Sequence, residues 1–128
     1  RPSILPQARS SVLLAKSYER SGDILRAELV ALNAAGIYPN DWLVHLTLAA
    51  MLLKDENADS FLWRIEEAIK KAEKGLGMNP KRQQRLDLVL VKTVFLAMSD
   101  RKGEARQLLE GVRPLTPELQ ELMRVLEQ

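Results

Sequence analysis

The chain has 128 residues, of which 46% are apolar and 28% are charged, and its formal net charge is +2. These values are typical of a folded soluble domain and exclude a disordered chain. No apolar run approaches the roughly 20 residues that a membrane-spanning helix needs, and the absence of cysteine excludes disulfides and thiolate chemistry.

Helix is expected almost throughout, because Leu, Ala, Glu, Lys, Arg and Gln dominate and no alternation of period two persists. Breakers and capping residues predict seven helices. Six of them cover residues 6–21, 23–35, 42–53, 81–98, 103–111 and 117–126. The remaining one, fourth in chain order, begins at Asn57 or Asp59 and ends at residue 74. Gly22 and Gly36 are expected helix ends, Asp41 and Thr116 are expected N-caps, and Pro80 is expected in a first turn. The segment GLGMNP is expected to end the fourth helix.

Two residue types recur along the chain at matching intervals of 41 and 37 residues. The recurring residues are Ala27, Ala68 and Ala105, and Pro39, Pro80 and Pro117. A shared period of this length indicates a repeat built from helical hairpins rather than an irregular bundle.

The first pair of predicted helices resembles a tetratricopeptide repeat. The residues that carry the resemblance are Leu14, Ala15, Tyr18, Gly22, Ala27, Ala31, Ala34 and Pro39. In this family small residues let the two helices cross closely, the tyrosine fills the space beside the crossing, and the glycine permits the tight turn.

Two weaker repeats follow this strong one. The second keeps Trp42, Ala49, Ala68, Ala72 and Pro80 but is about seven residues longer than the usual 34, and the third keeps Ala105, Leu109 and Pro117. The resemblance implies an all-α, right-handed solenoid formed by a single domain, residues 1–128. Its three hairpins would cover residues 7–36, 41–75 and 81–111, with a capping helix at 117–127.

The predicted fifth helix is apolar on almost every side, from Leu86 to Met98. Such a helix is normally buried all round, and the alternative is that one flank stays exposed and binds a partner.

The inventory of reactive residues is short. His45 is the only histidine, and we expect a structural or groove-lining role for it, with partner recognition or pH sensing as the alternative. The acidic pairs at 66–67 and 55–56 are expected on the solvated surface, and no glycine-rich phosphate loop occurs. We therefore expect no catalytic residue, no metal site and no cofactor, and hence no enzyme.

The resemblance places a concave, partner-binding groove on the first helix of each hairpin. On the first unit it implies Arg9, Val12, Lys16, Glu19 and Arg20, and on the second Leu43, Leu46, Ala50 and Leu53. Such a groove is basic at one end and apolar beyond, so a protein or peptide with acidic residues around an apolar anchor would complement it. The alternative is that Lys16 and Arg20 belong to a solvated face. Some members of the family clamp a chaperone's terminal carboxylate with Lys and Asn, but Val12 and Lys16 stand at those positions, so that clamp is not expected.

The leading hypothesis is a protein-interaction scaffold, in the setting of a bacterial assembly, secretion or envelope-biogenesis system. One alternative is a regulatory or oligomerisation domain of a larger regulator or enzyme. Another is nucleic-acid binding through the basic run KRQQR at residues 81–85 and the basic first helix. The opening residues RPSILPQARS carry no signal-like pattern, so we expect a piece of a longer protein, without membrane insertion and in either the cytoplasm or the periplasm.

Overall fold

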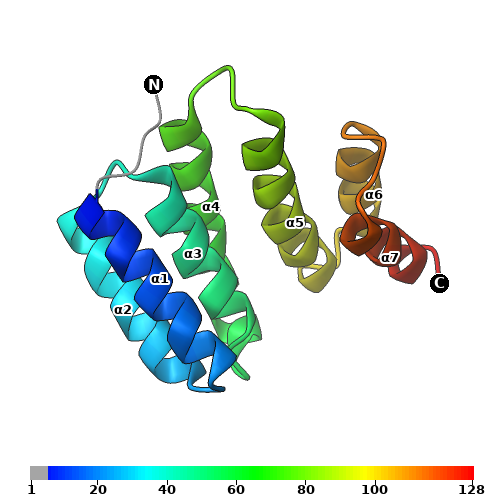
Figure 1. The fold of residues 1–128 in the computed structure, drawn as a ribbon. Helices are drawn as coiled ribbons and strands as arrows, with labels where there is room; N and C mark the ends of the chain where they lie inside the picture. Colours follow the sequence, from blue (N-terminus) through cyan, green and yellow to red (C-terminus); the bar gives the residue numbers. More distant parts are fainter. Residues whose placement is uncertain (1–5) are drawn as a thin grey trace. The chain divides into compact units, whose positions relative to one another are not determined.

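A computed structural model describes residues 6–128, in which every regular element is a helix and no strand occurs. The α-helices are α1 (Pro6–Arg20), α2 (Ile24–Ile37), α3 (Trp42–Leu53), α4 (Leu62–Leu76), α5 (Arg82–Met98), α6 (Lys102–Glu110) and α7 (Pro117–Leu126), shown in Figure 1. A short 3-10 helix, η1 (Ala58–Phe61), precedes α4. The predicted all-α class is therefore confirmed.

The chain divides into two compact units, an amino-terminal unit of residues 1–80 and a carboxy-terminal unit of residues 81–128, and each is described by itself. The hairpins α1–α2 and α3–α4 form the first unit, and the hairpin α5–α6 with α7 forms the second. The single domain and the right-handed solenoid stay predictions. The opening residues 1–5 lie outside the described part of the chain.

Small side chains lie where α2 contacts its neighbouring helices. Ala15 on α1 and Ala27 on α2 have no exposed surface, as expected for the crossing point of the first hairpin. Ala34 on α2 packs in one cluster with Val12 of α1 and Val44 of α3, so the alanine stripe of α2 faces two helices at once. Since α3 packs against α1, α2 and α4, it is the central helix of this unit.

Several predicted turns and caps are confirmed. Gly22 has φ +86°, a left-handed conformation that favours glycine, in the turn between α1 and α2. Asp41 caps α3, as predicted, by accepting from the N–H groups of Leu43 and Val44. Asp23, predicted as the first residue of the second helix, is its N-cap and accepts from the backbone N–H of Arg26. Each cap satisfies backbone donors that would otherwise lack a partner at the helix start.

Of the other two expected helix ends, one is wrong and one is confirmed. Gly36 does not end α2, which continues to Ile37 and closes with the N–H of Tyr38 donating to the Ala34 carbonyl. The GLGMNP segment ends α4, as predicted: the helix stops at Leu76, and Gly77, which has φ +79°, follows it. The first glycine of the segment, Gly75, lies inside the helix.

The start of α4 and the position of Pro80 also differ from expectation. Neither Asn57 nor Asp59 caps α4, because the chain first makes the 3-10 turn η1 and α4 begins at Leu62. Asp55 instead accepts from the Asn57 N–H at 2.7 Å in the loop before η1. Pro80 precedes Lys81, the N-cap of α5, and so lies outside the first turn.

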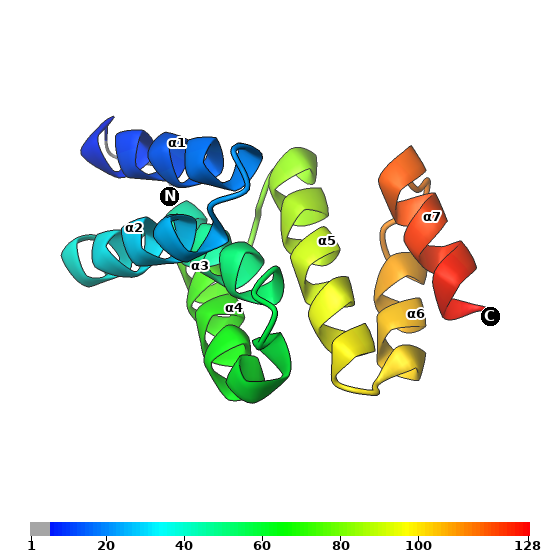
Figure 2. The same ribbon diagram turned by 90° about the horizontal axis from the view of Figure 1, so that it is seen from below.

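In the carboxy-terminal unit, α7 packs against both α5 and α6. Figure 2 shows α7 beside α6. Thr116 caps α7 by accepting from the Leu119 N–H, with Pro117 in the first turn, as predicted. The guanidinium of Arg106 on α6 donates to the carbonyl of Leu126 at 3.1 Å and so holds the end of α7. From Leu86 to Met98 no residue of α5 is exposed, in agreement with the apolar character of this helix.

The basic run at residues 81–85 has structural partners. The guanidinium of Arg82 donates to the carbonyls of Val112 and Pro114, at 3.2 and 2.7 Å, and so ties the start of α5 to the loop before α7. The side-chain carbonyl of Gln84 accepts from the Lys81 N–H at 2.8 Å. No helix in residues 6–128 combines the length and the apolar character that a membrane crossing requires.

A candidate partner-binding groove between α2 and α4

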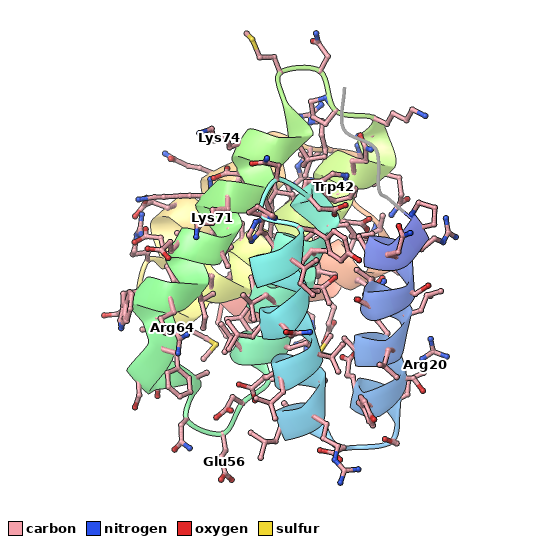
Figure 3. The ribbon with its side chains drawn as sticks, turned by 90° about the vertical axis from the view of Figure 1, so that its left-hand side faces the viewer. Arg20, Trp42, Glu56, Arg64, Lys71 and Lys74 are labelled. Carbon is pink, nitrogen blue, oxygen red and sulfur yellow. The ribbon has the colours of Figure 1, made fainter. Side chains whose placement is uncertain are left out.

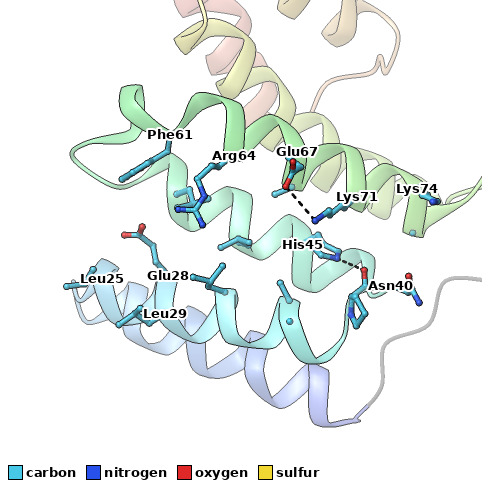
Figure 4. A pocket seen from close by; sticks show the side chains of 18 residues that line it. Leu25, Glu28, Leu29, Asn40, His45, Phe61, Arg64, Glu67, Lys71 and Lys74 are labelled. Atoms are coloured by element: carbon cyan, nitrogen blue, oxygen red, sulfur yellow. Dashed lines mark hydrogen bonds and ion pairs between the residues drawn. The ribbon is translucent and has the colours of Figure 1, made fainter.

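A groove of about 790 Å³ runs along the amino-terminal unit between α2 and α4, with α3 as its floor (Figure 4). The α2 wall is apolar and carries Leu25, Leu29 and Leu32. The α3 floor is mostly apolar and carries His45, Leu48 and Leu52. The α4 wall is basic and carries Arg64, Lys71 and Lys74. All of them belong to residues 1–80.

The α2 wall follows from the two-sided character of that helix. Its alanines Ala27, Ala31 and Ala34 are buried, whereas Leu25, Leu29 and Leu32 are 66%, 57% and 45% exposed. The leucines are four and three residues apart, so they form one stripe along the helix. Burying a leucine side chain is worth about 1.5–3 kcal/mol, so three leucines left open beside a groove are typical of a surface that another molecule covers.

The floor of the groove holds a fixed histidine. His45 is buried, and its Nε2 lies 2.6 Å from the carbonyl oxygen of Pro39, which also lines the groove. A carbonyl oxygen can only accept, so Nε2 carries the proton in this contact. The structure thus agrees with the expected structural or groove-lining role of His45.

The α4 wall carries the positive charge. Lys71 lies 3.6 Å from Glu67, a pair in which both side chains are more than half exposed, and the Arg64 guanidinium lies 5.9 Å from the centre of the Trp63 ring. Within the described part of the chain, no carboxylate forms an ion pair with Arg64 or Lys74. Figure 3 shows Arg64, Lys71 and Lys74 along α4, and Arg20 far from them on α1. The cations are therefore accessible from the groove side.

One acidic side chain also lines the groove. Burial, together with the neighbouring Asp55 carboxyl, raises the pKa of Glu28 from its ordinary value of 4.5 to about 7. The same contact, in which protonated Glu28 donates to Asp55, lowers the pKa of Asp55. Glu28 is therefore only partly ionised near neutral pH, and it weakens the positive charge of the groove less than a fully ionised glutamate would.

None of the nine residues expected in the groove of the first helices lines this one. The cationic members Arg9, Lys16 and Arg20 are exposed on α1. Glu19 is half-buried and forms an ion pair with Lys54, which follows α3.

The apolar members of that expected groove are covered. Val12 is 4% exposed because it packs against Val44 of α3, and Leu46 is also 4% exposed, so neither offers surface to a partner and both expectations are wrong. Leu43, Ala50 and Leu53 are half-buried.

A signal for the observed groove is present in the sequence. In α2 a stripe of alanines and a stripe of leucines occupy different faces, and only the smaller residues are needed for close helix packing. That pattern leaves the leucines of α2 free of the helix packing and available for contact with a partner. The basic wall could not be recognised in the same way, because Arg64, Lys71 and Lys74 come close to α2 only through the packing of both helices on α3.

The groove offers apolar contact, positive charge and a fixed imidazole.

Within residues 6–128 no group of three or more His, Asp or Glu side chains is arranged to hold a metal ion. No family model, curated protein or solved structure matches the chain.

Proposed function

We propose that this chain is a protein-interaction module of tetratricopeptide type, and that it binds a segment of a partner protein in the groove between α2 and α4. The observation that carries the proposal is the stripe of Leu25, Leu29 and Leu32, which stays exposed beside a hollow of about 790 Å³. A contiguous apolar surface in a concave site is the usual feature of a binding surface.

The groove is favoured over the surface formed by the first helices. On that surface Val12 and Leu46 are buried. The apolar anchor of a bound partner would therefore find only half-buried apolar residues to contact. In the α2–α4 groove three leucines and Phe61 are available together with the cations of α4. The groove therefore combines the two properties that a specific protein interface needs, an apolar centre and a polar rim.

The test is a selection of binding segments from a display library of random peptides of about 16 residues, a length that spans roughly 24 Å as a helix. Each selected segment is then measured against the wild-type chain, a Leu29→Asp variant and a Leu14→Asp variant. Leu14 is a matched control, since it is an exposed leucine on α1 that does not line the groove. Circular dichroism checks that both variants keep their helices.

The proposal predicts that the selected segments lose affinity by about tenfold or more on Leu29→Asp, because a charge would enter the apolar wall, and keep it on Leu14→Asp. Failure to select any segment, or equal loss on the two variants, would contradict it.

A further inference from the structure

The partner's chemistry can be read from the two walls of the groove, on the premise that the proposed function holds. We infer that the bound segment is an acidic amphipathic helix, which places an apolar stripe on Leu25, Leu29 and Leu32 and a stripe of Asp or Glu against Arg64, Lys71 and Lys74. Three observations support this assignment: the spacing of the wall residues, the exposed leucines, and the excess of positive charge.

The spacing of the residues on both walls suits a helix. The leucines of α2 follow one another at four and three residues, and the cations of α4 at seven and three residues. At about 1.5 Å per residue, Arg64 and Lys74 lie roughly 15 Å apart along α4, the length of about three helical turns. A partner helix with apolar residues at i, i+4 and i+7 can meet one wall, and an adjacent acidic stripe can meet the other.

The charge balance of the groove favours acidic residues over basic ones. Three cations line it, and the carboxylates that line it are Glu67, which already lies beside Lys71, and Glu28, which is only partly ionised near neutral pH. Arg64 and Lys74 form no ion pair with a carboxylate of the described chain. A basic helix would place like charges against them, whereas an acidic helix would supply the missing partners.

The experiment uses a second display library, made of helical segments of about 16 residues with leucine fixed at i, i+4, i+7 and i+11. The other positions are randomised among Glu, Gln and Lys. Selection is run on the wild-type chain and on two variants with the same change in charge. The first reverses the groove (Arg64→Glu, Lys71→Glu, Lys74→Glu), and the second reverses α1 (Arg9→Glu, Lys16→Glu, Arg20→Glu).

We expect glutamate to be enriched beside the leucine stripe on the wild type and on the α1 variant, and lysine to replace it on the groove variant. The affinity of an acidic segment should fall by about tenfold or more on the groove variant, since three exposed ion pairs become three repulsive pairs. A proline in the middle of a selected segment should abolish binding, because it breaks the helix.

The outcomes that overturn the inference differ from those that overturn the proposed function. Segments selected without regard to charge, a charge preference that changes equally on the α1 variant, or tolerance of the central proline would each exclude an acidic helix. They would leave a groove that binds protein segments. If random peptides bind and are sensitive to Leu29→Asp while no leucine-stripe segment is selected, the inference is again wrong and the proposed function stands. If neither library gives a binder, both are wrong.

Discussion

Gly75 on α4 lies directly against Trp42 at the start of α3. A Cβ atom on Gly75 would come within 3.0 Å of the Trp42 Cβ and 3.1 Å of its Cα and backbone nitrogen. Real Cβ atoms rarely approach other atoms this closely, and here the obstacle is backbone that cannot turn away. The glycine therefore permits close contact between helices, whereas the sequence pattern suggested only a helix end.

We predict that Gly75→Ala destabilises the amino-terminal unit by about 1–3 kcal/mol through overpacking. Gly36→Ala is the control, because Gly36 is helical and its added Cβ would meet nothing within 4 Å. Alanine there should be neutral or should stabilise the unit by about 0.5–1 kcal/mol, since glycine lowers helix stability. Denaturant unfolding of both variants measures the difference, and equal stabilities would show that α4 and α3 are farther apart.

Glu28 makes the stability of the chain depend on pH. Its pKa is about 7 in the folded chain against an ordinary 4.5, so between these values the folded state binds more protons than the unfolded state. Stability contributed by protonated Glu28 is therefore complete below about pH 4.5 and is lost as the pH rises through about 7. The pKa of Asp55 is lowered, so its contribution changes only below this window.

Glu28→Gln should accordingly flatten the fall in unfolding free energy between about pH 5 and pH 7.5. Denaturant titrations at several pH values measure this slope. Glu121→Gln is a suitable control, because hydrogen bonding to Arg124 lowers the pKa of Glu121 and places its titration below the window. An unchanged slope in Glu28→Gln would mean that the Glu28 carboxyl is neither buried nor held beside Asp55.

At the scale of the element, α2 shows how one helix serves two surfaces. Its alanine stripe is buried and its leucine stripe is exposed. Small residues allow α1 and α3 to approach, so the packing of the unit does not require the leucines. The leucines of α2 can therefore contact a partner while its alanines keep their packing in the core of the unit.

We predict that Ala27→Leu costs about 1–3 kcal/mol, because the added atoms cannot fit where α1 and α2 cross. Asn33→Leu, at an exposed position of the same helix, should change stability by less than about 0.5 kcal/mol. If thermal unfolding shows no loss for Ala27→Leu, the crossing of the first hairpin is wrongly assigned.

In the carboxy-terminal unit, Arg82 joins the first turn of α5 to the loop before α7. Arg82→Ala should destabilise this unit by about 1–3 kcal/mol, because the carbonyls of Val112 and Pro114 lose a charged donor. Arg85→Ala, at an exposed position on the same helix, should have little effect. Amide hydrogen exchange in α5 to α7 measures the change, and equal protection in both variants would contradict a structural role for Arg82.

At the scale of the whole molecule, features that depend on neighbouring residues, such as helix ends, could be predicted from the sequence. Features that depend on which helices pack together, such as the groove, could not. The α-helix ends that a cap or a positive φ determines, such as those at Asp41, Gly22 and Thr116, agree with prediction, because the chemistry of a few neighbouring residues decides them. The alanines that recur with the repeat period, Ala27, Ala68 and Ala105, are all buried.

The binding surface is different in kind, since it depends on which helices come together. Periodicity alone does not say whether Val12 faces a groove or the neighbouring α3, and it faces α3. It also does not bring Arg64 and Leu29 to opposite walls of one hollow, which requires both hairpins in place.

The central claim is that partners bind between α2 and α4, and mapping by nuclear magnetic resonance tests it most directly. A nitrogen-15-labelled chain is titrated with the strongest segment from the random library, and the backbone amide shifts are followed. The account predicts that the largest changes fall on residues 25–36 and 64–75, with α1 unaffected. Changes concentrated at Arg9, Lys16 and Arg20 instead would contradict it and would return the binding surface to the first helices.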